Sequence, residues 1–264
     1  MDRFFVKKSV LSRALMLALV ALCAFVLTVL NVSIGVTVAV CFFVAFSGYA
    51  VIMTAPVRLL VGAEKIFDGE CDPTHLLKES EFILGCLNEK NPNRLLVKVD
   101  QAVACIGTGD AERAIAILKE LDVEKKGTND VVRAIYYNDL SCAYAVLGDL
   151  KGAEENYEKS KGIIEGIKNR KQRESLEPFV LWMLAEIEYI RGNYENTLSL
   201  CERIPTKNAR DNVERSFLCA RAQLSLGKIA AARIMLEHVS VAGNKLWIAE
   251  KAKAMISDID RSCK

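Results

Sequence analysis

The chain has 264 residues, with 35 Lys and Arg, 33 Asp and Glu, and a formal net charge of +2. Residues 1–57 hold four basic residues and one acidic residue, which leaves 31 basic and 32 acidic residues for the remainder. A nearly neutral domain lacks the basic field that nucleic-acid-binding domains carry, so we expect no nucleic-acid partner.

An uncharged stretch near the N-terminus indicates a membrane anchor. Residues 14–57 contain no Asp, Glu, Lys or Arg, although charged residues make up 26 % of the chain. One helix needs about 20 apolar residues to cross a ~30 Å hydrocarbon core, so this stretch is long enough for two. A cluster of turn-forming residues at 31–35 divides it. We therefore predict transmembrane helices at 11–30 and 34–55, with Pro56 ending the second.

The competing interpretation of this stretch is a cleaved signal peptide, whose apolar core would be only about 7–15 residues long. Basic residues lie on both sides of the stretch: Arg3, Lys7, Lys8 and Arg13 before it, and Arg58 and Lys65 after it. Because basic segments stay on the cytoplasmic side of a membrane, we expect an integral plasma-membrane protein with its N-terminus and its polar part in the cytoplasm. Nine cysteines without a CxxC pair suit that reducing compartment.

After the anchor the sequence becomes polar and helical. Asp72 and Pro73 mark a helix start, and residues 58–91 are expected to form a juxtamembrane linker with one orphan helix. Signals for β-strands are weak. Further helices separated by short turns are predicted to the end of the chain, near 93–107, 110–122, 129–147, 150–168, 174–191, 194–205, 209–226, 229–240 and 244–261.

A short pattern recurs four times among these helices. It is a glycine followed by a small residue five positions later and an apolar residue nine positions later, and the residue seven positions before the glycine is also small. The four glycines are Gly109, Gly148, Gly192 and Gly227, at spacings of 39, 44 and 35 residues. Glycine ends a helix in a left-handed conformation without strain, and small residues let paired helices pack closely. Recurrence at this spacing indicates stacked helix pairs.

The second copy is the clearest. Residues 138–149, NDLSCAYAVLGD, are followed by Ala153 and Tyr157, and this set of positions resembles the tetratricopeptide repeat. The resemblance covers about 92–241, and it departs from the family pattern at Thr197 and Cys201, where Ala and an aromatic residue are usual. A generic helical bundle is the alternative.

The resemblance completes the predicted architecture, which is all-α. A membrane anchor of two transmembrane helices occupies 1–57. A tetratricopeptide-like α-solenoid of about four helix pairs, with a C-terminal capping helix, occupies 92–264. The resemblance implies a right-handed superhelix in which the first helix of each pair lines a concave groove, and it implies that this groove binds a peptide or a helix of a partner protein.

The repeat register places a candidate partner-binding surface mainly on the third and fourth copies. Its residues are Asn138, Phe179, Trp182, Glu186, Tyr189, Phe217 and Arg221. Aromatic anchors beside a charge suit a binding hot spot. The alternative is that the aromatic residues pack between repeats and that Glu186 and Arg221 only pair with each other. Arrays that clamp a C-terminal carboxylate use cationic groove residues, and here those positions hold Val99, Val103 and Asp139.

The sequence carries no motif for catalysis. We find no phosphate-binding glycine loop, no metalloprotease or nucleophile motif, and no cluster of histidine and cysteine, so we expect no catalytic residue, cofactor or metal. The basic run 168–173 is interpreted as a solvated linker between the second and third copies. We therefore expect a membrane-anchored adaptor, or scaffold, that binds a protein or peptide partner and meets the lipid bilayer through its hairpin. The alternative is a structural subunit of a larger membrane complex, assembled through that hairpin.

Overall fold

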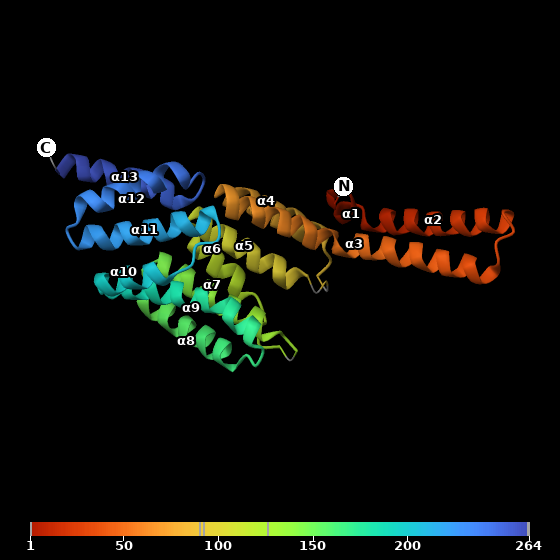
Figure 1. The fold of residues 1–264 in the computed structure, drawn as a ribbon, viewed down its shortest axis with the longest axis horizontal. Coiled ribbons are helices and arrows are strands. Elements are labelled where there is room, and N and C mark those ends of the chain that lie inside the picture. Colours follow the sequence, from red (N-terminus) through yellow and green to blue (C-terminus); the bar gives the residue numbers. More distant parts are fainter. Residues whose placement is uncertain (1, 90, 92, 126, 263–264) are drawn as a thin grey trace.

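The computed structural model describes residues 2–89, 91, 93–125 and 127–262, with only the backbone described at 9 and 10 (Figure 1). Within these ranges the protein contains thirteen α-helices and no strand, which confirms the all-α prediction. The helices are α1 (Asp2–Lys7), α2 (Ser9–Val29), α3 (Ile34–Glu70), α4 (Pro73–Cys86), α5 (Arg94–Thr108), α6 (Ala111–Lys119), α7 (Asp130–Val146), α8 (Leu150–Gly166), α9 (Arg170–Ile190), α10 (Tyr194–Arg203), α11 (Ala209–Ser225), α12 (Ile229–Ala242) and α13 (Trp247–Ser262).

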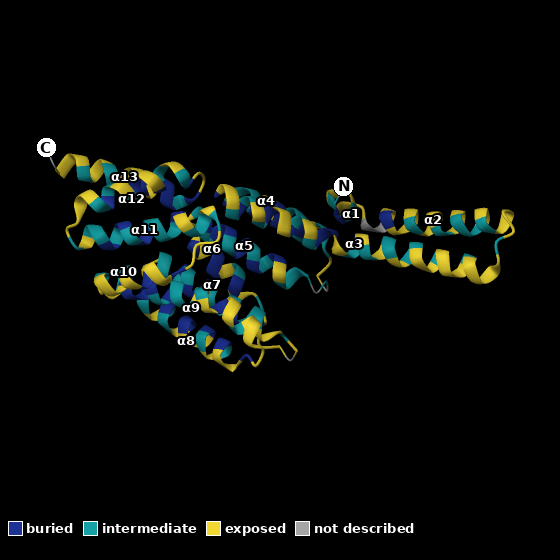
Figure 2. Ribbon diagram, viewed as in Figure 1, coloured by how far each residue is buried: buried dark blue, intermediate teal, exposed yellow. Residues whose placement is uncertain are grey.

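Helix α2 and the first half of α3 form a hairpin that projects from the helical domain (Figure 1). Both helices are long and apolar enough to cross a membrane, and only 6 % of the apolar window of each is buried. A core helix of a soluble domain would be mostly buried, and Figure 2 shows the hairpin as largely exposed or half-buried. The two helices approach closely at Gly48, where an added Cβ would lie 2.9 Å from Met16 Cγ. The predicted two-helix hairpin is therefore present.

The second helix of the hairpin does not end at Pro56. Helix α3 runs unbroken for 37 residues, about 55 Å, and carries Pro56 in its interior. Its second half is apolar on one side, and Leu60, Ala63 and Phe67 are each no more than 2 % exposed. Packing of this face against the helical domain stabilises the continuous helix although proline removes one backbone donor. The first part of the expected linker, up to Glu70, is therefore helical. Helix α3 ends at Glu70, and the next residue, Cys71, has a φ of 53°.

The four glycines end helices as the repeat pattern predicts. All four have positive φ, at 86°, 73°, 85° and 72° in chain order. At the first, Gly109 N donates to Ile106 O at 3.0 Å and Asp110 N donates to Cys105 O at 2.9 Å. The same two bonds occur at the other three turns, and they satisfy carbonyls that a helix end leaves unpaired. The helix pairs are consequently α5–α6, α7–α8, α9–α10 and α11–α12.

The small residues of the pattern lie where paired helices meet. Each of the eight is 0 % exposed; they are Ala102, Ala114, Ser141, Ala153, Ala185, Thr197, Ala220 and Ala232. The two that carry hydroxyls use them across the helix pair or along the helix. Ser141 Oγ donates to Ala153 O at 2.7 Å, and Thr197 Oγ1 donates to Asn193 O at 3.1 Å. The departure at Thr197 is therefore accommodated by one local hydrogen bond.

At two of the four glycine turns, the side chain of the next residue caps the helix that follows. The side chains of Asp110 and Asp149 accept hydrogen bonds from backbone amides at the start of α6 and α8, at 3.2 and 3.0 Å. Asn193 instead donates to the Glu188 carboxylate at 2.9 Å. The interpretation of 168–173 as a linker is wrong, because α9 already begins at Arg170, where the Asn169 side chain accepts from the Gln172 amide at 3.2 Å.

The last helices of the domain return to α3 and α4. Leu60, Phe67 and Leu76 share one buried cluster with Val213 and Leu236. The loop before α13 adds polar contacts to the same junction: Lys245 Nζ lies 2.6 Å from Asp72 Oδ2, and Asn244 Nδ2 donates to Glu70 O at 2.6 Å. The last helices of the helical domain therefore contact its first helices, and a cavity lies on the inner face of the domain.

Candidate binding cavity

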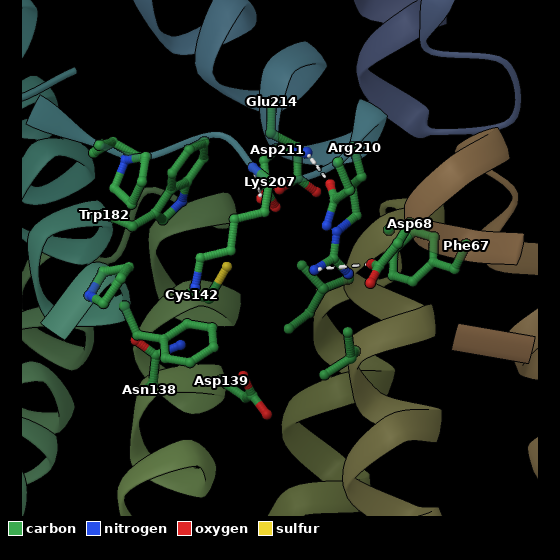
Figure 3. A pocket seen from close by; sticks show the side chains of 18 of the residues that line it. Phe67, Asp68, Asn138, Asp139, Cys142, Trp182, Lys207, Arg210, Asp211 and Glu214 are labelled. Atoms are coloured by element: carbon green, nitrogen blue, oxygen red, sulfur yellow. Dashed lines mark hydrogen bonds and ion pairs between the residues drawn. The ribbon is translucent and has the colours of Figure 1, made fainter. Parts of the chain in front are cut away.

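A cavity of about 300 Å³ lies on the inner face of the helical domain. Residues from α3, α5, α7, α9, α11 and the α10–α11 connection form its wall; among them are Phe67, Asp68, Val103, Asn138, Asp139, Cys142, Phe179, Trp182, Lys207, Arg210, Asp211 and Glu214 (Figure 3). Ligand pockets span about 300–1,000 Å³. This volume suits one side chain or a very short segment and not a long peptide. We call this space the main cavity.

A smaller cavity of about 90 Å³ adjoins the main cavity. Both are lined by Cys142, Trp182 and Glu214, so the two spaces share a wall. Helices α9, α11 and the start of α13 form much of the rest of the smaller cavity, which includes Glu186, Phe217, Arg221 and Trp247. Six of the seven predicted surface residues therefore line one of these cavities or both, and Tyr189 lines neither.

Three of the predicted residues reach the main cavity. Asn138 and Trp182 are half-buried in its wall, and Phe179 is 42 % exposed. Ser175, Pro205 and Lys207 are also exposed and line the same cavity. Because these exposed residues gather on the first turns of α9 and on the connection before α11, we identify this side as the mouth of the main cavity. Phe179 is the aromatic residue at that mouth.

The other predicted residues pack among themselves. Glu186 accepts two hydrogen bonds from Arg221 Nη2, at 2.9 and 2.7 Å, and the two side chains are 17 % and 20 % exposed. The Arg221 guanidinium stacks over Tyr189 at 4.3 Å and over Phe217 at 5.1 Å. Phe217 is only 3 % exposed and meets the Trp247 ring edge-on at 5.8 Å. Glu186, Tyr189, Phe217 and Arg221 therefore contact one another, as the alternative of packing between helices predicts.

The main cavity is unusually rich in charge. Four carboxylates line it, on Asp68, Asp139, Asp211 and Glu214, together with two cations, Arg210 and Lys207. Arg210 pairs with Asp68 at 3.3 Å, and its guanidinium covers the Phe67 ring at 4.4 Å. The Asp211 carboxylate accepts from the Lys207 backbone amide at 2.9 Å. These contacts satisfy Asp68 and Asp211 and leave the other two carboxylates without such partners.

Asp139 and Glu214 are the poorly matched groups. Asp139 is 8 % exposed, and its buried Oδ2 accepts no hydrogen bond from any residue that the structure describes. Burial raises the pKa of Asp139 to about 7, although Asn138 and Arg210 act in the opposite direction. Burial also raises the pKa of Glu214 to about 7 against the attraction of Arg210. Both carboxylates are therefore held in a site that disfavours their charge.

A second carboxylate pair lies near this cavity. The pKa of Asp100, on α5, is raised to about 8 by burial and by the neighbouring charge of Glu64, on α3. Burial likewise raises the pKa of Glu64, which shares a hydrogen bond with Asp100. Neither residue lines the cavity itself, but Asp100 repels Asp139. The interior between α3, α5, α7 and α11 is consequently acidic as a whole.

Sequence reasoning missed this charge. It named Asp139 only as a place where a cationic clamp is lacking, and it assigned Asp68 to a linker. The available signal was a carboxylate at an inward position of the best repeat copy, together with Arg210 and Glu214 four residues apart on one face of α11. Within the described ranges no group of three or more His, Cys, Asp or Glu is arranged to hold a metal ion.

The sequence was also compared with known proteins. No protein-family model, no curated protein and no solved structure matches this chain.

Proposed function

We propose that this protein is a membrane-anchored adaptor whose helical domain binds a segment of a partner protein in the main cavity. The observation that carries the proposal is the cavity itself: a space with an aromatic mouth and with a buried carboxylate oxygen that no described residue satisfies. Burial of such an oxygen without a partner is unfavourable, so a donor from a bound segment would be stabilising there.

The tetratricopeptide likeness supports this proposal. Four glycine-ended helix pairs with fully buried small residues at equivalent positions provide the scaffold of such an array. The first helices of the pairs, α5, α7, α9 and α11, line the cavity, as the inner helices of the array should. The partner contact would be one inserted side chain with short flanks, because the cavity has a volume of only about 300 Å³.

Anchoring is proposed from the hairpin, and its cytoplasmic orientation from the charges at its base. Asp2 of α1 pairs with Arg58 of α3 at 2.7 Å, and Arg3 pairs with Glu79 of α4. Both ends of the hairpin thus carry basic residues at the same level, next to the helical domain. Tethering a binding domain at a membrane raises the effective concentration of its partner there.

Orientation has a direct test. A biotin-acceptor peptide inserted after Gly127, an exposed residue between α6 and α7, is expected to be biotinylated by a ligase expressed in the cytoplasm and not by a ligase supplied outside intact cells. The opposite labelling pattern would place the helical domain on the far side of the membrane.

The adaptor role is tested by photo-crosslinking in cells. Benzoylphenylalanine in place of Phe179, at the cavity mouth, is expected to capture a partner, and Trp182→Ala should abolish the capture. Benzoylphenylalanine in place of Ile234, which is 69 % exposed on α12, is the matched control. Capture that survives Trp182→Ala but disappears when an unrelated hairpin replaces residues 9–55 would favour the structural-subunit alternative, in which the exposed hairpin is the assembly surface.

A further inference from the structure

We propose that the side chain bound in the main cavity is basic, a lysine or an arginine of the partner segment; this inference rests on the proposed function. The argument uses the charge of the wall, the unmatched oxygen of Asp139 and the shape of the mouth.

The wall of the main cavity carries more acidic than basic side chains. Four carboxylic acids, on Asp68, Asp139, Asp211 and Glu214, line it together with the cations of Arg210 and Lys207. Arg210 is held between Asp68, at 3.3 Å, and the ring of Phe67. Glu214, Asp68, Asp211 and Asp139 all attract its guanidinium. A cavity lined mainly by acidic groups favours a basic ligand group.

Asp139 supplies the independent observation that points to a ligand. Its Oδ2 is buried at the cavity wall without a donor from any described residue. Glu214 lines the wall on the facing helix α11, where it is half-buried and within the attraction of Arg210. An ammonium or guanidinium group offers several donors, which the Oδ2 of Asp139 lacks, and a positive charge, which both carboxylates attract. A neutral amide would supply donors without the charge.

The rest of the cavity suits the stem of such a side chain. Trp182, Phe179 and Val103 contribute apolar surface to the wall of the cavity. Figure 3 shows Trp182, Asp139 and Glu214 on different sides of one space. Lysine and arginine bury their methylene stems against apolar surface while their charged heads reach a polar partner. A volume of about 300 Å³ accommodates one such chain and excludes a folded partner element.

Lys207 is the resident competitor of the incoming cation. It is exposed at the mouth, and Figure 3 shows its side chain extending into the cavity toward Cys142. Its amine donates no hydrogen bond among those found in the described residues, so it adds a positive charge to the wall without satisfying a carboxylate. Removing this cation by Lys207→Gln should strengthen the binding of a basic peptide.

The experiment uses the full chain in phosphatidylcholine nanodiscs at about 0.15 M salt, which suppresses non-specific charge attraction. Two peptide libraries with random flanks are presented, one with a central lysine and one with norleucine, and captured peptides are quantified by mass spectrometry. We expect about tenfold preference for lysine. Asp139→Asn and Glu214→Gln should remove the preference and Lys207→Gln should increase it, whereas Glu155→Gln, on the exposed face of α8, should leave it unchanged.

Four results would overturn the inference. Equal capture of both libraries that still depends on Trp182 would leave the adaptor proposal standing without the basic side chain. A lysine preference that persists in both Asp139→Asn and Glu214→Gln would place the cation elsewhere. Displacement of the captured peptides by an equal concentration of n-butylamine would identify a free amine as the occupant. No Trp182-dependent capture of either library would reject the proposed function together with this inference.

Discussion

Asp139→Asn is expected to stabilise this protein progressively as the pH rises. The substitution preserves the size of the side chain and removes its ionisation. The pKa of Asp139 is about 7 in the folded chain, against an ordinary value of 3.8. The folded state therefore holds its proton when the unfolded state has already lost it. The contribution of Asp139 to the free energy of unfolding therefore falls as the pH rises from about 4 to about 7. Asparagine does not ionise, so the variant avoids this loss.

The magnitude follows from the shift. Each pKa unit corresponds to about 1.4 kcal/mol. Between pH 5 and pH 8 the folded carboxylate titrates through its pKa of about 7, so the stability of the Asp139 protein falls by about two of these units. We expect the gap between the variant and the natural chain to widen by about 3 kcal/mol over this range. Groups that do not interact with Asp139 titrate equally in both proteins and cancel from the gap. Asp100, whose pKa Asp139 helps to raise, changes the gap in the same direction.

The assay is urea denaturation of the full chain in detergent micelles, followed by tryptophan fluorescence at pH 5 and pH 8. Both tryptophans, Trp182 and Trp247, lie in the helical domain and line the smaller cavity, so the signal reports on this region. Asp122→Asn, in the exposed α6–α7 connection, is the matched control and should show no such gap. A gap for Asp139→Asn that does not change with pH, or a variant less stable at both values, would show that the Asp139 carboxylate is satisfied and would refute the reasoning.

Two further predictions concern the scaffold and use the same urea midpoints. Ala185→Leu should lower the free energy of unfolding by about 1–3 kcal/mol, because Ala185 is 0 % exposed at a helix crossing. Ala230 is exposed, so Ala230→Leu should leave this free energy unchanged. Equal effects of the two substitutions would contradict close packing at the crossing. Gly148→Ala should destabilise by about 1 kcal/mol, because its φ is 73°. Gly162→Ala, inside α8 with open space around the added methyl, should raise the free energy of unfolding by about the same amount. If both substitutions stabilise or both destabilise the protein, the left-handed conformation of Gly148 does not determine its effect.

The local features of the fold could be predicted from the sequence. A glycine that ends a helix, an Asp that starts the next and a small residue at a crossing act over fewer than ten residues, so Gly148, Asp149 and Ala153 identify a helix pair without knowledge of the rest. The hairpin could also be predicted from the sequence, because residues 14–57 contain no charged residue. These signals located every helix pair of the domain to within a few residues at most boundaries.

The cavity could not be predicted in the same way. It depends on the return of α11 to α3, which brings Arg210 to Asp68 across more than a hundred residues. No local pattern encodes that closure. Pro56 suggested a break in α3, whereas tertiary packing of Leu60 and Phe67 keeps the helix continuous. The register identified Trp182 as inward-facing, but its neighbours in the cavity are supplied by a segment that had been taken for a linker.

The unbroken course of α3 sets a limit on how the protein can be divided. The helix that would cross the bilayer is the same helix whose last turns bring Phe67 and Asp68 to the wall of the main cavity. A soluble fragment that starts at residue 69 would lose Asp68 and would expose Val213 and Leu236, which α3 now helps to cover. The hairpin and the helical domain thus share one helix, and a fragment intended for binding studies has to retain α3 from about residue 58 onward.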